Sequence, residues 1–206
     1  NMTVDILENG DAVVSEEITY DFMGDFNGIL RDIDGDRTDG IINLEIYVLE
    51  GNEFIPFRED YGGDAYTYEL SEEGSLKKLK IYEQSSDEEK TFKINYTLAN
   101  VAEKYTDVGI LNRKMIDSGW DVGINNVTIT MTIPEGATKE DLKVFAHGPL
   151  TGESTIVDNR TFTFKAPYLG GEFLETLVIF PPELISSSTN VFDEVKLPSI
   201  LENEER

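Results

Sequence analysis

The stretch Trp120–Pro134, WDVGINNVTITMTIP, carries the clearest periodic signal in the chain. Apolar side chains alternate with threonines from Val127 to Ile133, so the apolar residues share one face and the hydroxyls share the other. This pattern predicts a half-buried β-strand that ends at Pro134, because proline cannot donate to a sheet ladder. The apolar residues from Trp120 to Ile124 alternate in the opposite phase, which predicts a bulge or tight turn at Asn125-Asn126 that brings both sets to one core.

Stretches of the same kind recur along the chain, separated by glycine, proline, asparagine and aspartate. The predicted strands include 2–6, 12–22, 41–49, 76–82, 91–98 and several short ones between Lys143 and Phe180. Many short strands with frequent turn signals and almost no helical period indicate an all-β fold, an antiparallel β-sandwich. A few short helical turns are expected beside the strands, at 100–106 and at 137–142, where Thr138 precedes Asp141 with the spacing of a helix cap.

The connections between these strands differ in character. Asn9-Gly10 favours positive φ and predicts a tight hairpin after the first strand. The stretch Gly24–Gly40 has glycines, five aspartates and no sustained period, so it is predicted to be a loop. Glu83–Lys90 is predicted to be an acidic connection between two strands.

A chain of 206 residues is within the range of one all-β domain, and two small sandwiches are the alternative. Residues 1–182 are predicted to form the β-sandwich domain, and residues 183–206 an acidic linker or an exposed helix that leaves the domain. No run of about 18 apolar residues occurs, so no membrane span is predicted within the sequence.

The balance of charges restricts the possible partners. There are 41 acidic and 17 basic residues, which give a formal net charge of -24. Such a surface repels phosphate backbones and anionic lipids, which argues against nucleic acid binding and leaves cationic partners and metal ions open. The sequence has no cysteine, so disulfides, thiol nucleophiles and zinc-thiolate sites are excluded.

Two groups of residues are candidate binding sites. Alternate carboxylates suit a hard cation, and the aspartates that make a calcium site conceivable are Asp32, Asp34, Asp36 and Asp39. They depart from the helix-loop-helix calcium motif, since the glycine follows too early, at Gly35, and Asn43 stands at the twelfth position; a solvated acidic turn is the alternative. The tyrosines that could form an aromatic platform for a sugar or peptide are Tyr61, Tyr66, Tyr68 and Tyr82, and core or cross-strand packing is the alternative.

No catalytic residues are predicted. Arg31 lies in the aspartate-rich stretch and is expected to pair locally with a carboxylate. His147 is the only histidine, next to Gly148-Pro149, and is interpreted as a hydrogen-bonded turn residue. The sequence contains neither a serine-nucleophile elbow nor a phosphate-binding glycine loop, so no enzyme activity and no cofactor other than a possible calcium ion is expected.

Several short motifs, taken in order, resemble the N-terminal part of a family of bacterial predicted membrane proteins, domain of unknown function 2207. The residues that carry the resemblance are Asn9-Gly10-Asp11, Val14, Glu16 or Glu17, Ile18, Tyr20, Phe22, Gly28 to Ile33, Ile94-Asn95-Tyr96, Trp120, Pro134, His147-Gly148-Pro149 and Phe180-Pro181. The resemblance implies a signal peptide, an extracytoplasmic domain and then membrane helices. In that arrangement Leu197–Arg206 is the approach to a span that lies outside this sequence.

These observations leave three hypotheses for function. The first is a non-catalytic extracytoplasmic domain of a membrane-anchored bacterial protein, which serves interaction or sensing with a protein or glycan partner at the cell surface. The second is a carbohydrate- or peptide-binding module that uses the tyrosines. The third is a hydrolase that uses paired carboxylates, which 41 acidic residues will supply by chance in any fold.

Overall fold

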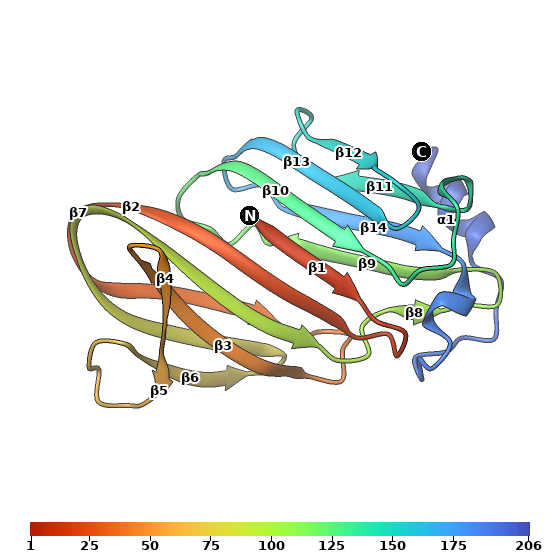
Figure 1. The fold of residues 1–206 in the computed structure, drawn as a ribbon. Coiled ribbons are helices and arrows are strands. Elements are labelled where there is room, and N and C mark those ends of the chain that lie inside the picture. Colours follow the sequence, from red (N-terminus) through yellow and green to blue (C-terminus); the bar gives the residue numbers. More distant parts are fainter. The chain divides into compact units, whose positions relative to one another are not determined.

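The computed structural model describes residues 1–206, and most of its regular structure consists of fourteen β-strands, with two 3₁₀ helices and one α-helix (Figure 1). The predicted all-β fold, an antiparallel β-sandwich, is confirmed. The chain divides into two compact units: unit 1 consists of residues 1–13 and 100–206, and unit 2 of residues 14–99. The boundary predicted at residue 182 lies inside unit 1.

Unit 1 has two layers of strands. In one layer the order is β12-β13-β10-β1, and in the other it is β11-β14-β9-β8. All of these pairs are antiparallel except β1 with β10. The strands are β1 (Met2–Ile6), β8 (Glu103–Lys104), β9 (Gly109–Ile116), β10 (Ile124–Thr132), β11 (Lys143–His147), β12 (Glu153–Ile156), β13 (Thr161–Leu169) and β14 (Leu174–Phe180).

The stretch with the clearest alternation forms β10. Val127, Ile129 and Met131 are buried, as predicted, and Ile129 pairs in register with the buried Phe164 of β13. The predicted slip at Asn125-Asn126 is wrong, because β10 keeps one register with β13 from Ile124 to Thr132. Asn126 instead adopts a left-handed φ of 55° without an inserted residue. Upstream of it Val122 is exposed, whereas Ile124 is half-buried and pairs with the buried Leu169 of β13.

The C-terminal segment packs against the second layer of unit 1. After η2 (Pro182–Ile185), α1 (Leu197–Glu204) forms the predicted helix. Its Ile200 is 7% exposed and belongs to a cluster with Leu177 and Ile179 of β14, so the helix is packed on the sheet rather than exposed. The sequence allowed a linker or an exposed helix here and did not indicate the sheet face that the helix covers.

Three local predictions in unit 1 have clear outcomes. The Asn9-Gly10 turn is present, with Gly10 at φ 85° and the N–H of Leu7 bonded to the carbonyl of Asp11. Thr138 and Asp141 cap the short helix η1 (Lys139–Asp141), as expected. The helical turn predicted at 100–106 is wrong, because residues 103–104 form β8 and pair with β9.

Unit 2 is organised around two long neighbouring strands, β2 (Ala12–Asp34) and β7 (Leu76–Leu98), which we call the ribbon. Figure 1 shows both strands curving back on themselves. The remaining strands pair with the two arms of β7: β3 (Ile41–Glu50) and then β4 (Glu53–Pro56) on one arm, β6 (Thr67–Glu73) and then β5 (Arg58–Glu59) on the other.

The long strands overturn two predictions. The loop predicted at Gly24–Gly40 is wrong for its first part, because β2 continues to Asp34, and only residues 35–40 form a turn. Glu83–Lys90 is not a connection, because β7 runs through it. Both strands bend where the sequence lacks periodicity. The N–H of Gly24 donates to Asp87 Oδ1 at 2.7 Å, and Asp87 has a φ of 43°. At the bend, hydrogen bonds from backbone and hydroxyl groups to acidic side chains therefore fix the strands, where elsewhere the alternation of apolar side chains does so.

Candidate functional site

The four aspartates of the calcium hypothesis lie at the end of β2 and in the turn that follows. Asp32 and Asp34 are the strand residues, and Asp36 and Asp39 are exposed in the turn. Asp34 Oδ1 accepts hydrogen bonds from the N–H of Asp36 at 2.9 Å and from Ser75 Oγ at 2.7 Å. No group of three or more histidine, aspartate or glutamate side chains is arranged to hold a metal ion. Calcium binding by these residues stays a prediction for solution experiments.

The four tyrosines lie on β6, on β7 and in the loop before β6, but each makes its own contacts. The hydroxyls of Tyr61, Tyr66 and Tyr82 are bonded to Glu59, Glu50 and Glu69 respectively, which raises the pKa of each phenol. Tyr68 is half-buried, and burial raises its pKa. The ring of Tyr66 packs on Phe57 at 5.8 Å between centroids, and none of the four rings stacks on another.

His147 lies at the end of β11 between two carboxylates of unit 1. Its Nε2 is 3.1 Å from Glu204 Oε2 of α1, and its Nδ1 is 3.6 Å from Glu175 Oε2 of β14. The histidine therefore connects the C-terminal helix to the sheet. The expectation of a hydrogen-bonded histidine agrees with this geometry, although the partner in α1 could not be read from the turn sequence.

A buried ion pair connects the two ends of β2, the first long strand of the ribbon. The guanidinium of Arg31 holds both carboxylate oxygens of Glu16, at 2.7 and 3.0 Å, and Tyr96 Oη donates to Glu16 Oε1 at 2.6 Å. Burial opposes the charge of Arg31, but Glu16 outweighs it and raises the arginine pKa above its ordinary value. The predicted pairing of Arg31 with a carboxylate is thus present, with a partner fifteen residues away instead of a neighbouring aspartate. This cluster connects β2 with β7 inside unit 2.

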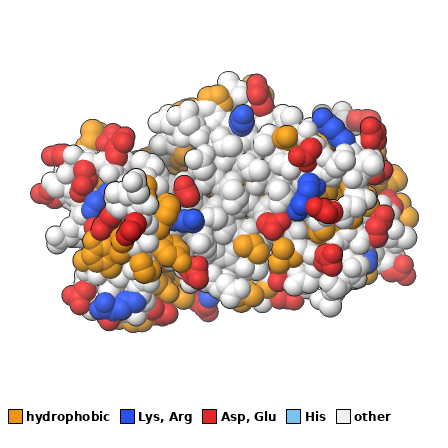
Figure 2. All heavy atoms as spheres, viewed as in Figure 1, with side chains coloured by type: hydrophobic (Ala, Val, Ile, Leu, Met, Phe, Trp, Pro, Cys, Tyr) orange, Lys and Arg blue, Asp and Glu red, His pale blue; other side chains and the backbone are white.

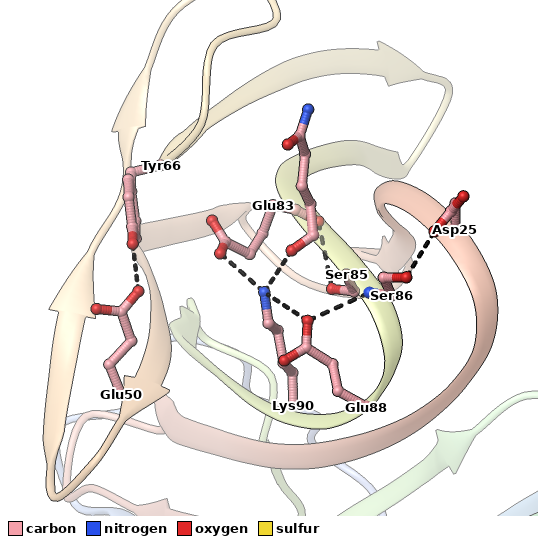
Figure 3. A network of polar contacts seen from close by, with 9 residues as sticks. Asp25, Glu50, Tyr66, Glu83, Ser85, Ser86, Glu88 and Lys90 are labelled. Carbon is pink, nitrogen blue, oxygen red and sulfur yellow. Dashed lines mark hydrogen bonds and ion pairs between the residues drawn. The ribbon is translucent and has the colours of Figure 1, made fainter.

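A second polar cluster lies at the bend of β7, and we call Glu50, Tyr66, Glu83, Glu88 and Lys90 the bend cluster (Figure 3). The ammonium of Lys90 is 2.9 Å from Glu83 Oε1 and 3.5 Å from Glu88 Oε1, and it also donates to the carbonyl of Gln84. Sequence reasoning missed this cluster, because it treated the segment as a solvated connection. The one available signal was the lysine that ends the acidic run Asp87-Glu88-Glu89.

The backbone around the bend cluster is fixed on both strands. Ser86 Oγ donates to Asp25 Oδ1 at 2.6 Å, and the N–H of Ser86 donates to Glu88 Oε1 at 3.2 Å. Together with the bond from Gly24 to Asp87, these contacts hold β2 and β7 at the turning point. The carboxylates of the cluster are therefore presented by a hydrogen-bonded scaffold.

Glu83 is the unusual member of the bend cluster. The residue is 8% exposed, yet its Oε2 has no hydrogen-bond partner. Figure 3 shows this carboxylate extending toward Tyr66 and Glu50. Tyr66 Oη donates to Glu50, and that bond, then burial, then the charges of Glu83 and Glu50 raise the pKa of Tyr66 to about 12. The carboxylates of Glu50 and Glu83 thus both raise the pKa of Tyr66. Within the cluster, Lys90 is the one positive charge beside the three carboxylates of Glu50, Glu83 and Glu88.

Comparison with known proteins supports the resemblance found in the sequence. The model of the N-terminal domain of a predicted membrane protein, DUF2207, matches residues 1–180. A search of the curated proteins found no match. None of the helices in the structure has both the length and the apolar character needed to cross a membrane.

Proposed function

The chain belongs to the DUF2207 family of predicted membrane proteins, and we propose that it acts there as a non-catalytic interaction or sensing domain on the extracytoplasmic face of a bacterial membrane. The arrangement that the family resemblance implies, a domain that precedes the membrane helices, supports the proposed position outside the cell. The partner we propose is a protein with a cationic surface.

The distribution of charge is the observation that carries this proposal. Unit 2 contains 21 acidic and 8 basic residues, and the remaining 20 acidic and 9 basic residues belong to unit 1. Figure 2 shows acidic side chains spread over the surface in view and more numerous than basic ones. A field of one sign speeds association with partners of the opposite sign and rejects partners of the same sign.

Binding to defined peptides tests the proposal. The chain of residues 1–206 is expected to bind a lysine-rich peptide and not a glutamate-rich peptide of equal length. Because surface charges are screened by salt, the affinity for the lysine-rich peptide should fall steeply between about 50 and about 300 mM NaCl. Failure of all cationic peptides to bind would contradict the proposal. A sugar that binds in a glycan array and is lost in Tyr66→Ala would favour the carbohydrate-binding alternative instead.

Sidedness is tested separately in cells. A protease-sensitive tag placed in the exposed segment around Leu150 of the full-length membrane protein should be cleaved by protease added to intact cells. A tag that is cleaved only after lysis would place the domain on the cytoplasmic side.

A further inference from the structure

The bend cluster already holds one ammonium group, and that group belongs to the chain itself. Lys90 Nζ sits among oxygens of Glu83, Glu88 and the Gln84 backbone. A primary ammonium has three N–H donors and no acceptor, so a set of carboxylate and carbonyl oxygens around one point suits it. The chain thus contains a preformed ammonium position at the bend of β7.

The second oxygen of Glu83 is not used by Lys90. It is buried, has no hydrogen-bond partner, and belongs to a side chain that is 10% exposed. A buried acceptor without a donor costs free energy, and a charged acceptor costs more than a neutral one. Glu50, Glu83 and Glu88 carry three negative charges against the one positive charge of Lys90, so the cluster can take another cation.

We propose that the bend cluster binds the ammonium group of a lysine side chain from the partner protein, between Glu83 Oε2 and Glu50. The inference rests on the proposed function, because it names the chemical group through which the cationic partner is recognised. Two acceptors from two strands suit a compact ammonium. A divalent metal ion is the poorer candidate, since no three acidic side chains gather in a suitable arrangement.

Tyr66 controls access to this position. Tyr66 lies on the side of Glu83 to which the unpartnered oxygen points, and its hydroxyl donates a hydrogen bond to Glu50 (Figure 3). The entering ammonium must displace Tyr66 from Glu50, so the phenol and the ligand compete for one carboxylate. Removing the hydroxyl while keeping the ring should therefore strengthen binding.

The test uses NMR titration of residues 1–206 with Nα-acetyl-lysine methylamide, with its Nε-acetylated form as the uncharged control. Binding should be at least about tenfold weaker in Glu83→Gln, because the acceptor charge is lost. The matched control is Glu89→Gln, which removes the same charge from an exposed neighbour outside the cluster and should change the affinity little. Tyr66→Phe should bind about two- to fivefold more tightly.

Three outcomes would overturn the inference. They are no binding by the wild-type chain, equal losses in Glu83→Gln and Glu89→Gln, and binding of the Nε-acetylated form as strong as that of the charged form. Equal losses of affinity in the two variants would contradict the ammonium site but not the proposal of a cationic partner. Failure of the lysine-rich peptides to bind would contradict both proposals. Putrescine is a separate arm: tighter binding of putrescine than of the lysine-rich peptide would identify a free amine instead of a protein partner.

A second measurement covers the case in which Glu83→Gln does not fold. Lys90→Ala empties the existing ammonium position, so methylammonium should raise the Tm of this variant more than that of the wild type. Tetramethylammonium, which has no N–H donor, should not discriminate between the two proteins. Equal effects of both ions on both proteins would show that the cluster does not receive an ammonium group.

Discussion

Tyr20 and Tyr96 lie beside the buried ion pair of Glu16 and Arg31, but only Tyr96 forms a hydrogen bond with it. Tyr96 donates to Glu16, whereas the Oη of Tyr20 is buried without a partner. Burial raises the pKa of Tyr20 to about 12, because the phenolate would be poorly solvated there. The ring of Tyr20 still packs edge-on against Phe92 at 5.8 Å. The hydroxyl of Tyr20 therefore adds little to stability, and its ring adds much.

Tyrosine-to-phenylalanine changes separate the two roles. Tyr20→Phe should leave the free energy of unfolding unchanged or raise it by up to about 1 kcal/mol, because a buried unpaired hydroxyl is removed. Tyr96→Phe should lower it by about 1 to 3 kcal/mol, because a hydrogen bond to a buried carboxylate is lost. Urea unfolding of both variants measures the difference. Equal destabilisation by the two changes would mean that Tyr20 has a hydrogen-bond partner in solution.

At the scale of elements, the ribbon of unit 2 depends on a close approach of β2 and β7. A Cβ built on Gly28 would lie 1.9 Å from the carbonyl oxygen of Ile81, and Gly28 has a φ of 154°. Gly24, at the bend of the same strand, has a φ of 95° but open space around it. Both glycines therefore have a positive φ, but only Gly28 also lacks space for a Cβ.

Alanine at these positions should have unequal effects. Gly28→Ala should destabilise unit 2 by more than about 3 kcal/mol or prevent its folding, because backbone atoms of β7 cannot move aside cheaply. Gly24→Ala should cost about 1 to 2 kcal/mol, the price of a left-handed conformation alone. Thermal unfolding followed by circular dichroism tests both. A Gly28→Ala protein as stable as Gly24→Ala would contradict the tight pairing of β2 with β7.

The sequence predicted elements where side-chain alternation is sustained, and failed where polar contacts decide the conformation. Val127, Ile129 and Met131 identified β10, since their burial follows from period alone. Asp25 and Asp87 gave no such signal, because their bonds connect residues more than sixty positions apart. The same cause hid the candidate site: Glu83 looks like any exposed acid until the fold brings it near Tyr66 and Glu50.

The C-terminal helix α1 is held at its start by a carboxylate from another part of unit 1. Asp107 accepts the N–H groups of Lys196 at 2.8 Å and Leu197 at 2.9 Å. Burial works to raise the pKa of Asp107, but these backbone hydrogen bonds outweigh it and hold the pKa below its usual range. A carboxylate at this position also interacts favourably with the helix dipole.

Asp107→Ala should therefore loosen α1. Loss of such a cap costs about 0.5 to 2 kcal/mol, and hydrogen exchange of the first helical amides should accelerate in the variant. Because the folded pKa is lowered, the stabilisation is present above the unfolded pKa and is lost as pH falls through the folded value. The difference in Tm between the wild type and the variant should stay constant from pH 7 to 5 and shrink below about pH 3.8. A difference that vanishes already at pH 6 would contradict the assignment of Asp107 as the group that holds the start of α1.

At the scale of the whole molecule, like-charge repulsion opposes folding. A net charge of -24 lowers the stability of the compact state, and each added salt weakens this repulsion. The screening length falls from about 30 Å at 10 mM salt to about 8 Å at 150 mM. Any divalent ion will therefore stabilise the protein at low ionic strength, with or without a binding site. A test for calcium has to remove this general effect first.

Adding calcium at 150 mM NaCl separates specific binding from general charge screening, because the salt already screens most of the repulsion. If no specific site exists, 1 mM calcium should raise the Tm by no more than about 1 °C and no more than magnesium does. A site with a dissociation constant of about 10 µM would instead add about 2.7 kcal/mol, or roughly 5 to 11 °C for a chain of this size. We expect the small shift, because Asp34 already accepts bonds from Asp36 and Ser75. A large calcium-specific shift that disappears in Asp34→Ala, while an exposed control such as Asp121→Ala retains it, would establish the aspartates at the end of β2 and in the following turn as a calcium site.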